Sequence, residues 1–284
     1  SLTGRIDAPW QGADLFGLPV GPGKLGATLG GGVLRVEPIR VRVGDAGQIN
    51  AQAAARLAPR PRYAELAPGP LVTDVSISQE VSERVLKFIA PVLADATRAD
   101  GRFSISLAEL RAPIDRPELS RARGQLDVHS VQVLPGPSIA ALVQLVRQLR
   151  GVVRDGVEGL ADSNQRPIVT MSDRVIDFTM ADGRIYHRGL EFFVGDALVT
   201  SEGSVGVDET LDLLVRVPIQ EAWVQQRPVL LGGLRGQSID IPVGGTFDKP
   251  EIDLDAFRRI SRDLLQSAAQ GALDGLLRGL RAPR

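Results

Sequence analysis

Residues 211–219 read LDLLVRVPI, with an apolar side chain at every second position. Asp212 and Arg216 occupy two of the intervening positions. A period of two residues is typical of a β-strand with one buried face. The stretch therefore predicts a strand whose apolar face needs a partner. That face consists of Leu211, Leu213, Val215, Val217 and Ile219.

The same alternation recurs elsewhere in the chain. Residues 33–43, VLRVEPIRVRV, alternate on both sides of Glu37-Pro38, which we expect to form a bulge or an edge kink. Residues 175–180, VIDFTM, predict another strand. The apolar positions that these two stretches add to the candidate face are Leu34, Val36, Ile39, Val41, Val43, Ile176 and Phe178.

Glycine-containing turn pairs separate the predicted strands. Asp100-Gly101, Asp182-Gly183 and Gly195-Asp196 lie between alternating runs, which is a strong signal for a β-hairpin. Parallel crossovers would need a dozen or more residues each. Residues 175–207 therefore predict an antiparallel meander, and the chain as a whole is predicted to be mainly β.

Three segments show helical spacing instead: residues 79–99, residues 138–160 and an amphipathic stretch at 254–280. Pro91 should kink or break the first of them. We predict three regions, which could form one continuous domain. They are an N-terminal β-module with a proline-rich linker (1–70), a helix-sheet-helix segment (71–166) and a β-meander with a terminal helix (167–284).

Composition excludes several classes of function. The 284 residues carry a formal net charge of −1 and only 4% aromatic residues, so nothing favours binding to nucleic acid. Cysteine is absent, and the two histidines have no metal-ligand spacing. We predict no metal, no cofactor and no catalytic residue. No signal peptide or membrane span is recognisable, so we expect any anchor to lie upstream.

Residues 21–26, GPGKLG, match the G-x-G-x-x-G spacing of dinucleotide-binding loops. Such a loop must leave a strand and enter a helix, because the helix N-terminus holds the phosphates. Here three more glycines and a strand follow. We therefore interpret the glycines as turn residues between strand segments that need a positive φ.

Ser138 raises the possibility of a hydrolase. It lies in GPSIA (136–140), between a predicted strand and a predicted helix, as a nucleophile elbow would. That elbow belongs to parallel α/β sheets, however, and His187 lies inside a predicted strand. An N-cap role for Ser138 is favoured. Labelling by a serine-reactive fluorophosphonate would decide between the two.

The C-terminal region resembles a known family. A second strand, IDIPV, follows residues 211–219, and then come Gly245-Thr246, Pro250 and a predicted helix. A G-T-x-x-x-P element after alternating strands is similar to the C-terminal region of the AsmA-like family of bacterial envelope proteins, which includes TamB. The resemblance covers about residue 167 to the end, and it assigns Gly245, Thr246 and Pro250 to the family motif.

The resemblance implies a long, twisted antiparallel sheet curled into a groove or half-pipe. It also implies a periplasmic module, anchored to the inner membrane by a region outside this chain or contacting a membrane through its C-terminal helix. The implied function is to hold phospholipid acyl chains and to support assembly of the outer membrane. The alternative is a structural module of the envelope whose own helices fill the apolar face.

Overall fold

The chain is mainly β. Its computed structural model describes residues 3–94, 96, 98–134, 136, 140, 142–147, 169–226 and 235–253. The strands before the first helix are β1 (Gly4–Trp10), β2 (Ala13–Leu15), β3 (Leu18–Val20), β4 (Gly23–Gly30), β5 (Val33–Val36), β6 (Ile39–Val43), β7 (Gly47–Ala51), β8 (Ala53–Arg56), β9 (Tyr63–Leu66) and β10 (Gly69–Ser76). The later strands are β11 (Arg98–Pro113), β12 (Arg121–Leu134), β13 (Val169–Met171), β14 (Arg174–Ala181), β15 (Arg184–Val194), β16 (Ala197–Gly206), β17 (Leu211–Pro218), β18 (Ser238–Gly245) and β19 (Pro250–Ile252).

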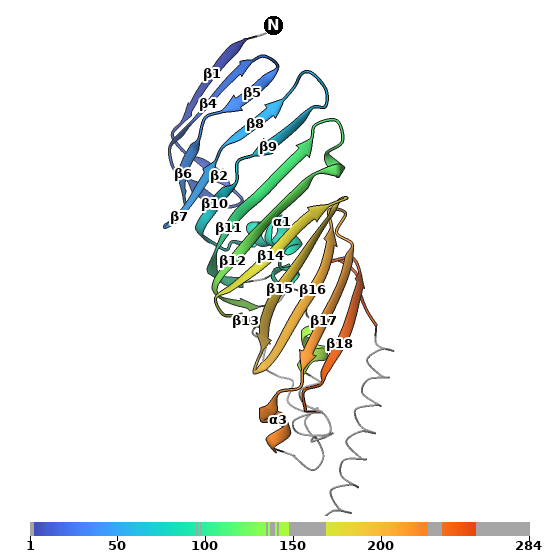
Figure 1. Cartoon of the computed structure of the whole chain (residues 1–284). Coiled ribbons are helices and arrows are strands. Elements are labelled where there is room, and N and C mark those ends of the chain that lie inside the picture. Colours follow the sequence, from blue (N-terminus) through green and yellow to red (C-terminus); the bar gives the residue numbers. More distant parts are fainter. Residues whose placement is uncertain are drawn as a thin grey trace, which may run out of the picture.

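All of these strands belong to one antiparallel sheet, which is long and twisted (Figure 1). Two branches of strands run to β11: β1-β4-β5-β8-β9 on one side and β2-β3-β6-β7-β10 on the other. From β11 onward a meander continues to β19, as the sequence predicts for residues 175–207. The sheet runs unbroken across both predicted region boundaries.

Prolines explain why the first half of the sheet divides into branches. Pro22 separates β3 from β4, Pro38 separates β5 from β6, and Pro68 separates β9 from β10. Proline has no N–H to donate to a neighbouring strand, so these three breaks fall at prolines, whereas β7 and β8 are separated at Gln52. The predicted break at Glu37-Pro38 is confirmed. The proline-rich linker predicted at the end of the first region, residues 55–70, contains the end of β8, all of β9 and the start of β10.

Two of the three predicted hairpin turns are present. Asp182 and Gly183 have φ values of +50° and +71°, and they join β14 to β15. Gly195 has φ +64° in the turn before β16. The prediction of a turn at Asp100-Gly101 is wrong. Strand β11 continues through these two residues, and its register with β12 shifts there. Gly101 is needed there because a Cβ would lie 2.4 Å from the Val131 side chain.

Helical structure is shorter than the sequence predicts. Residues 79–99 form α1 (Gln79–Arg84), then the 3₁₀ helices η1 (Leu86–Phe88) and η2 (Pro91–Leu93), and then enter β11. Pro91 starts η2, as expected of a helix break. A third 3₁₀ helix, η3 (Pro117–Leu119), and α3 (Glu221–Gln226) were not predicted. Thus only two α-helices, not three, have bounds within the described residues. Residues 140 and 142–147 are helical, and the predicted helix at 254–280 lies outside the described residues.

Polar contacts hold α1 and η1 against the sheet. Ser78 caps α1: its Oγ accepts a hydrogen bond from the Val81 N–H at 3.1 Å and donates one to the Phe16 carbonyl at 2.8 Å. The Lys87 ammonium pairs with Glu209 at 2.8 Å and lies 5.4 Å from the centre of the Phe247 ring. Ser78 thus contacts the loop between β2 and β3, and Lys87 contacts the turn after β16. The helical segment, which consists of α1, η1 and η2, therefore bridges both parts of the sheet.

The glycines of GPGKLG serve close packing. Gly21 lies between β3 and β4, as predicted, but Gly21, Gly23 and Gly26 are absent from the residues with positive φ, so the prediction of a positive φ is wrong. A Cβ on Gly23 would lie 2.2 Å from the Trp10 ring, and one on Gly26 would lie 2.4 Å from the Glu37 carboxylate. The Trp10 indole also donates a hydrogen bond to the Gly21 carbonyl at 2.9 Å. These glycines let neighbouring side chains cross β4.

Gly245, Thr246 and Pro250 form the turn between β18 and β19. Gly245 has φ +76°, and a Cβ there would lie 2.3 Å from the Lys249 carbonyl oxygen. The Thr246 hydroxyl accepts a hydrogen bond from the Lys249 N–H at 3.2 Å. Pro250 opens β19, which pairs only with β18 among the described strands. The element therefore ends the sheet with a tight hairpin.

We expect Gly245→Ala to lower the free energy of unfolding by about 1–3 kcal/mol, because alanine is strained at this φ and its Cβ meets backbone. Urea denaturation would measure the change. Gly30→Ala is the control, since a Cβ at Gly30 meets nothing within 4 Å and φ is not positive there. Equal stability of the Gly245 variant and the wild type would contradict this account of the turn.

Candidate functional site

One row of apolar side chains crosses most of the sheet. Strand pairing links Ile6 to Ala27, Ala27 to Val36, Ala53 to Leu66 and Leu66 to Leu110, and Val36 and Ala53 are next to each other in the β5–β8 register. From Leu110 the row continues through Ala122, Met180, Ile185, Val205 and Leu211. Paired residues in adjacent strands project to the same face. The sheet therefore has one apolar face from β1 to β17, which we call the inner face.

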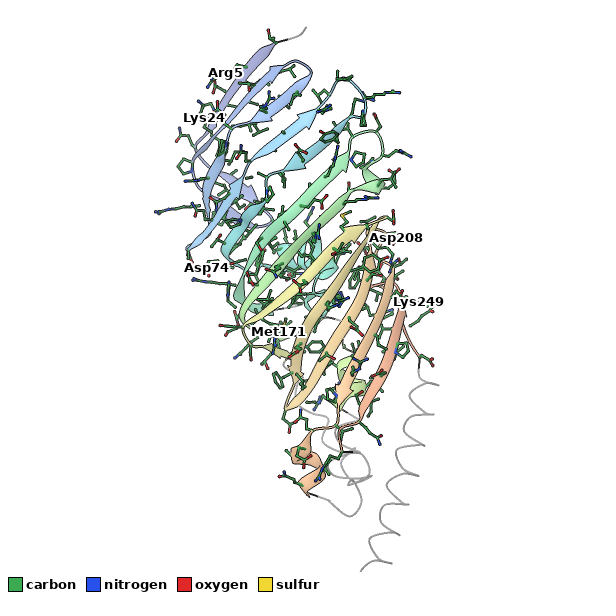
Figure 2. All side chains as sticks on the ribbon, viewed as in Figure 1. Arg5, Lys24, Asp74, Met171, Asp208 and Lys249 are labelled. Atoms are coloured by element: carbon green, nitrogen blue, oxygen red, sulfur yellow. The ribbon has the colours of Figure 1, made fainter. Side chains whose placement is uncertain are left out.

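The opposite face of the first strands is charged. The neighbouring row reads Arg5, Thr28, Arg35, Ala54, Glu65 and Arg111. Arg5 and Lys24, labelled in Figure 2, each lie 2.8 Å from the Asp7 carboxylate. Hydrogen bonds from Arg5 and then Lys24 lower the pKa of Asp7 from 3.8 to about 2. The two faces thus differ sharply in character, and only the inner one suits an apolar ligand.

Over β6 and the second half of the sheet, the inner face is covered by the chain itself. Leu86 and Leu93 of the helical segment are fully buried, as are Val143 and Val146 of residues 142–147. They belong to one core cluster with the strand residues of the inner face. The predicted contact residues within this core are Val41, Val43, Ile176, Phe178, Leu211, Leu213, Val215, Val217 and Ile219. In this structure these nine are packed against protein.

The inner face of the first branch is open. Leu34 and Val36, which were predicted as contact residues, are half-buried there, and Ile39 is half-buried beyond the break in the same strand. Ile6 is 58% exposed and Leu25 is 36% exposed. No described helix lies over these strands in Figure 1. We call this surface the open strip; it comprises Ile6, Ala8, Leu25, Leu29, Leu34, Val36, Ala53, Ala55, Ala64, Leu66, Leu110 and Ala112.

An apolar pocket of about 210 Å³ lies where the open strip meets the helical cover. Val85, Phe88 and Ile89 line it on the helical side. Ala122 and Met180, which continue the row from Leu110, line it on the sheet side. The pocket also includes Arg84, Phe178, Ile185 and Val207. It extends the apolar surface of the strip beneath η1.

Sequence reasoning identified only two residues of the open strip, Leu34 and Val36. Ile6 and Leu66 were missed because each lies in a short stretch without a strong alternating pattern. Leu110 was missed because the alternation of β11 changes phase where its register shifts, between Leu107 and Glu109. The signal that finds them is the strand register, which pairs each with an apolar neighbour. That register depends on residues far apart in the sequence.

The two histidines lie on opposite faces. His129 is exposed, and its Nε2 lies 3.0 Å from the Ser104 Oγ. His187 is buried in the inner face with its Nε2 3.2 Å from the Ser201 Oγ. Its Nδ1 is buried without a hydrogen-bond partner, and desolvation lowers its pKa from 6.5 to about 4. Ser138, the other half of the hydrolase hypothesis, lies outside the described residues.

Among the described residues, no group of three or more histidines and acidic side chains is placed to hold a metal ion. No helix in this part of the chain is long and apolar enough to cross a membrane. Comparison with known proteins found no matching family, curated protein or solved structure. The resemblance to the AsmA-like family therefore stays a prediction from the sequence.

Aspartate should have different effects on the two halves of the inner face. Val215→Asp should lower the free energy of unfolding by about 3–5 kcal/mol, because Val215 is 1% exposed and the charge would have no partner. Leu34→Asp should cost only about 1–2 kcal/mol, since water can reach it. Urea denaturation of both variants tests the division, and equal losses would contradict it.

Acid should destabilise the protein through His187. The unfolded chain takes up a proton near pH 6.5, whereas the folded chain takes it up only near pH 4. Stability should therefore fall as the pH drops through this window, by about 3 kcal/mol. Urea denaturation from pH 7.5 to 4.5 would show a smaller loss for His187→Gln than for the wild type.

The exposed histidine supplies the control for this pH dependence. His129→Gln should lose as much stability on acidification as the wild type, because His129 lies at the surface. If His187→Gln instead follows the wild type, the buried imidazole is not the origin of the acid sensitivity.

Proposed function

We propose that the chain is a non-catalytic lipid-binding module that holds acyl chains on the open strip. The observation that carries the proposal is an uncovered apolar sheet face that is continuous with the protein's own core. Large exposed apolar surfaces on soluble proteins usually mark binding sites. Charged residues occupy the other face of the same strands, which leaves the inner face as the apolar contact surface.

The dimensions suit an extended hydrocarbon chain. The strip crosses β1, β4, β5, β8, β9 and β11, so five inter-strand spacings of about 4.8 Å give a length of about 24 Å. A hydrocarbon core of about 30 Å contains two lipid leaflets, so one acyl chain spans about half of that. A single chain therefore fits along the strip, and the pocket beneath η1 extends the apolar surface further.

The chemistry of the strip favours hydrocarbon over other ligands. Its residues are alanine, valine, leucine and isoleucine, which offer no side-chain hydrogen bond to a sugar, nucleotide or peptide. Burial of apolar area stabilises a complex by about 25 cal/mol per Å² without any polar partner. An acyl chain uses this interaction alone, so no catalytic group is needed.

The cellular setting of the proposal comes from the family resemblance. We infer that the sheet curls into a groove, that the module lies in the bacterial periplasm, and that phospholipid is its ligand. Anchoring to the inner membrane through a region outside this chain belongs to the same proposal. Support for outer-membrane assembly would then follow from moving or storing these lipids.

A structural module of the envelope is the second candidate. One observation favours it: Leu86, Leu93 and Val143 cover the inner face from β11 onward, so much of the sheet is already filled. The two candidates differ only at the open strip. A structural module would leave the strip empty or place a protein partner on it, and a lipid-binding module would carry hydrocarbon there.

Native mass spectrometry of protein purified without detergent should detect bound lipid. The double variant Leu29→Asp/Leu34→Asp places charges on the open strip, and we expect it to carry at least ten-fold less lipid than the wild type. Charge in an acyl-binding surface would have to be desolvated, which is costly.

The matched control is Thr28→Asp/Arg35→Asp. Thr28 and Arg35 are paired one position away in the same two strands and project to the opposite face. This control should retain bound lipid. A wild type that neither carries lipid nor takes it up from vesicles would refute the proposal and favour the structural module.

A further inference from the structure

Exposed apolar side chains gather at one edge of the sheet. Of eight large apolar residues that the described part of the chain exposes, four lie between strands along this edge: Leu57, Ile114, Leu119 and Val207. Two others, Ile6 and Leu25, belong to the open strip. Isolated exposed apolar residues need no explanation, but a cluster of them marks a contact surface.

Leu57, Ile114 and Leu119 lie on two adjacent hairpin tips. The Ile114 N–H donates a hydrogen bond to the Arg62 carbonyl at 3.1 Å, and the Arg62 Nε lies 3.0 Å from the Asp115 carboxylate. These contacts join the loop after β8 to the loop after β11, and Figure 1 shows the two ends side by side. We call residues 56–62 and 111–121 together the tip.

The tip is strongly basic. It contains six arginines (Arg56, Arg60, Arg62, Arg111, Arg116 and Arg121) against two acidic residues, Asp115 and Glu118. Its net charge is therefore +4, whereas that of the whole chain is −1. Arg62 lowers the pKa of Asp115 chiefly by hydrogen bonding, and Arg60 and Arg116 add their charges. Three guanidinium groups thus surround a single carboxylate.

Most of these arginines are available to an external partner. Arg60, Arg116 and Arg121 are exposed, and within the described residues only Arg62 of the tip forms an ion pair. Arg111 stacks on the Tyr63 ring at 3.7 Å, and Arg56 lies 5.5 Å from the same ring. A guanidinium group that stacks on an aromatic ring keeps its positive charge, so both arginines still contribute to the positive charge of the tip.

We propose that the tip docks on the surface of an anionic lipid bilayer. Arginines beside exposed leucine and isoleucine form the combination that binds membrane interfaces: the cations attract anionic headgroups, and the apolar side chains enter the boundary with the acyl chains. An acidic protein surface would match the charge of the tip, but an anionic bilayer presents continuous hydrocarbon directly beneath its charged groups, which suits Leu57, Ile114 and Leu119 beside the arginines.

The geometry also connects the tip to the open strip. Leu57 follows Ala55 by two residues, and Ile114 follows Ala112 by two residues, so both continue the alternation of the inner face. A bilayer bound at the tip would therefore meet the end of the open strip. This connection depends on the proposed function, whereas the docking itself does not.

Co-sedimentation with vesicles tests the docking. The wild type should bind vesicles of phosphatidylcholine with 30 mol% phosphatidylglycerol at least ten-fold more tightly than vesicles of phosphatidylcholine alone, and salt should weaken this binding. The variant Arg60→Gln/Arg116→Gln/Arg121→Gln should lose at least ten-fold in affinity. Leu57→Ser/Ile114→Ser should lose affinity even at low salt.

Two control variants carry the same changes elsewhere on the surface. Arg40→Gln/Arg42→Gln/Arg188→Gln removes three exposed arginines away from the tip, and Val175→Ser/Tyr186→Ser removes two exposed apolar residues. Both should bind vesicles like the wild type. Equal losses in the controls would show non-specific attraction and overturn the proposal, as would failure of the wild type to bind anionic vesicles.

The two proposals fail separately. Tip variants should keep the lipid that co-purifies with the protein, because the open strip is intact. The strip variant Leu29→Asp/Leu34→Asp should lose that lipid and still bind anionic vesicles. Loss of vesicle binding in the strip variant alone would contradict docking through the tip.

Discussion

The structure depends on the register of its strands. In a pleated strand, successive side chains project to opposite faces, so a slip of one residue would transfer every apolar side chain to the charged face. The pairing from β1 to β17 keeps one apolar row intact even where the strands break at Pro38 and Pro68. Because that row forms the core in the second half of the chain, register errors there would cost burial along the whole sheet. The same register extends the apolar row beyond the core and into the first branch, where the row is exposed.

Side-chain size distinguishes the covered half of the inner face from the open half. Bulky residues such as Phe192, Leu126 and Ile241 fill the covered half, where they share one core cluster with the helical segment. Alanines at positions 8, 53, 55, 64 and 112 occupy much of the open strip. An alanine exposes little apolar area, so the uncovered strands cost less in water than leucines would. Small residues also leave a shallow surface on which an extended chain can lie.

Much of this fold could be predicted from local sequence patterns, and the rest depends on long-range contacts. The alternation in residues 211–219 and the turn at Asp182-Gly183 each act within a few residues, so both predictions are confirmed. The prediction of a turn at Asp100-Gly101 failed because the same dipeptide can form a bulge within a strand. Here the side chain of a distant residue, Val131, packs across Gly101. The prediction of positive φ for the glycines at 21–26 failed for the same reason. Distant side chains, Trp10 at Gly23 and Glu37 at Gly26, leave no room for a Cβ. The candidate site was only partly predicted. Regular alternation of apolar and polar residues identifies the strands of the core, but the strands of the open strip alternate only weakly.

Exposure and charge converge at a single corner of the molecule. The inner face is apolar along its length, but the first branch is left uncovered, and its strands end at the two hairpin tips that hold Arg56, Arg60, Arg111, Arg116 and Arg121, all of them exposed. An apolar surface with no cation beside it would attract protein and membrane alike. A basic surface with no apolar residue would bind any polyanion. The two properties together select a partner that presents anionic groups above hydrocarbon, which is the chemistry of a bilayer surface. If the strip also accepts acyl chains, the lipid would leave that surface where the inner face begins, without passing through the charged outer face.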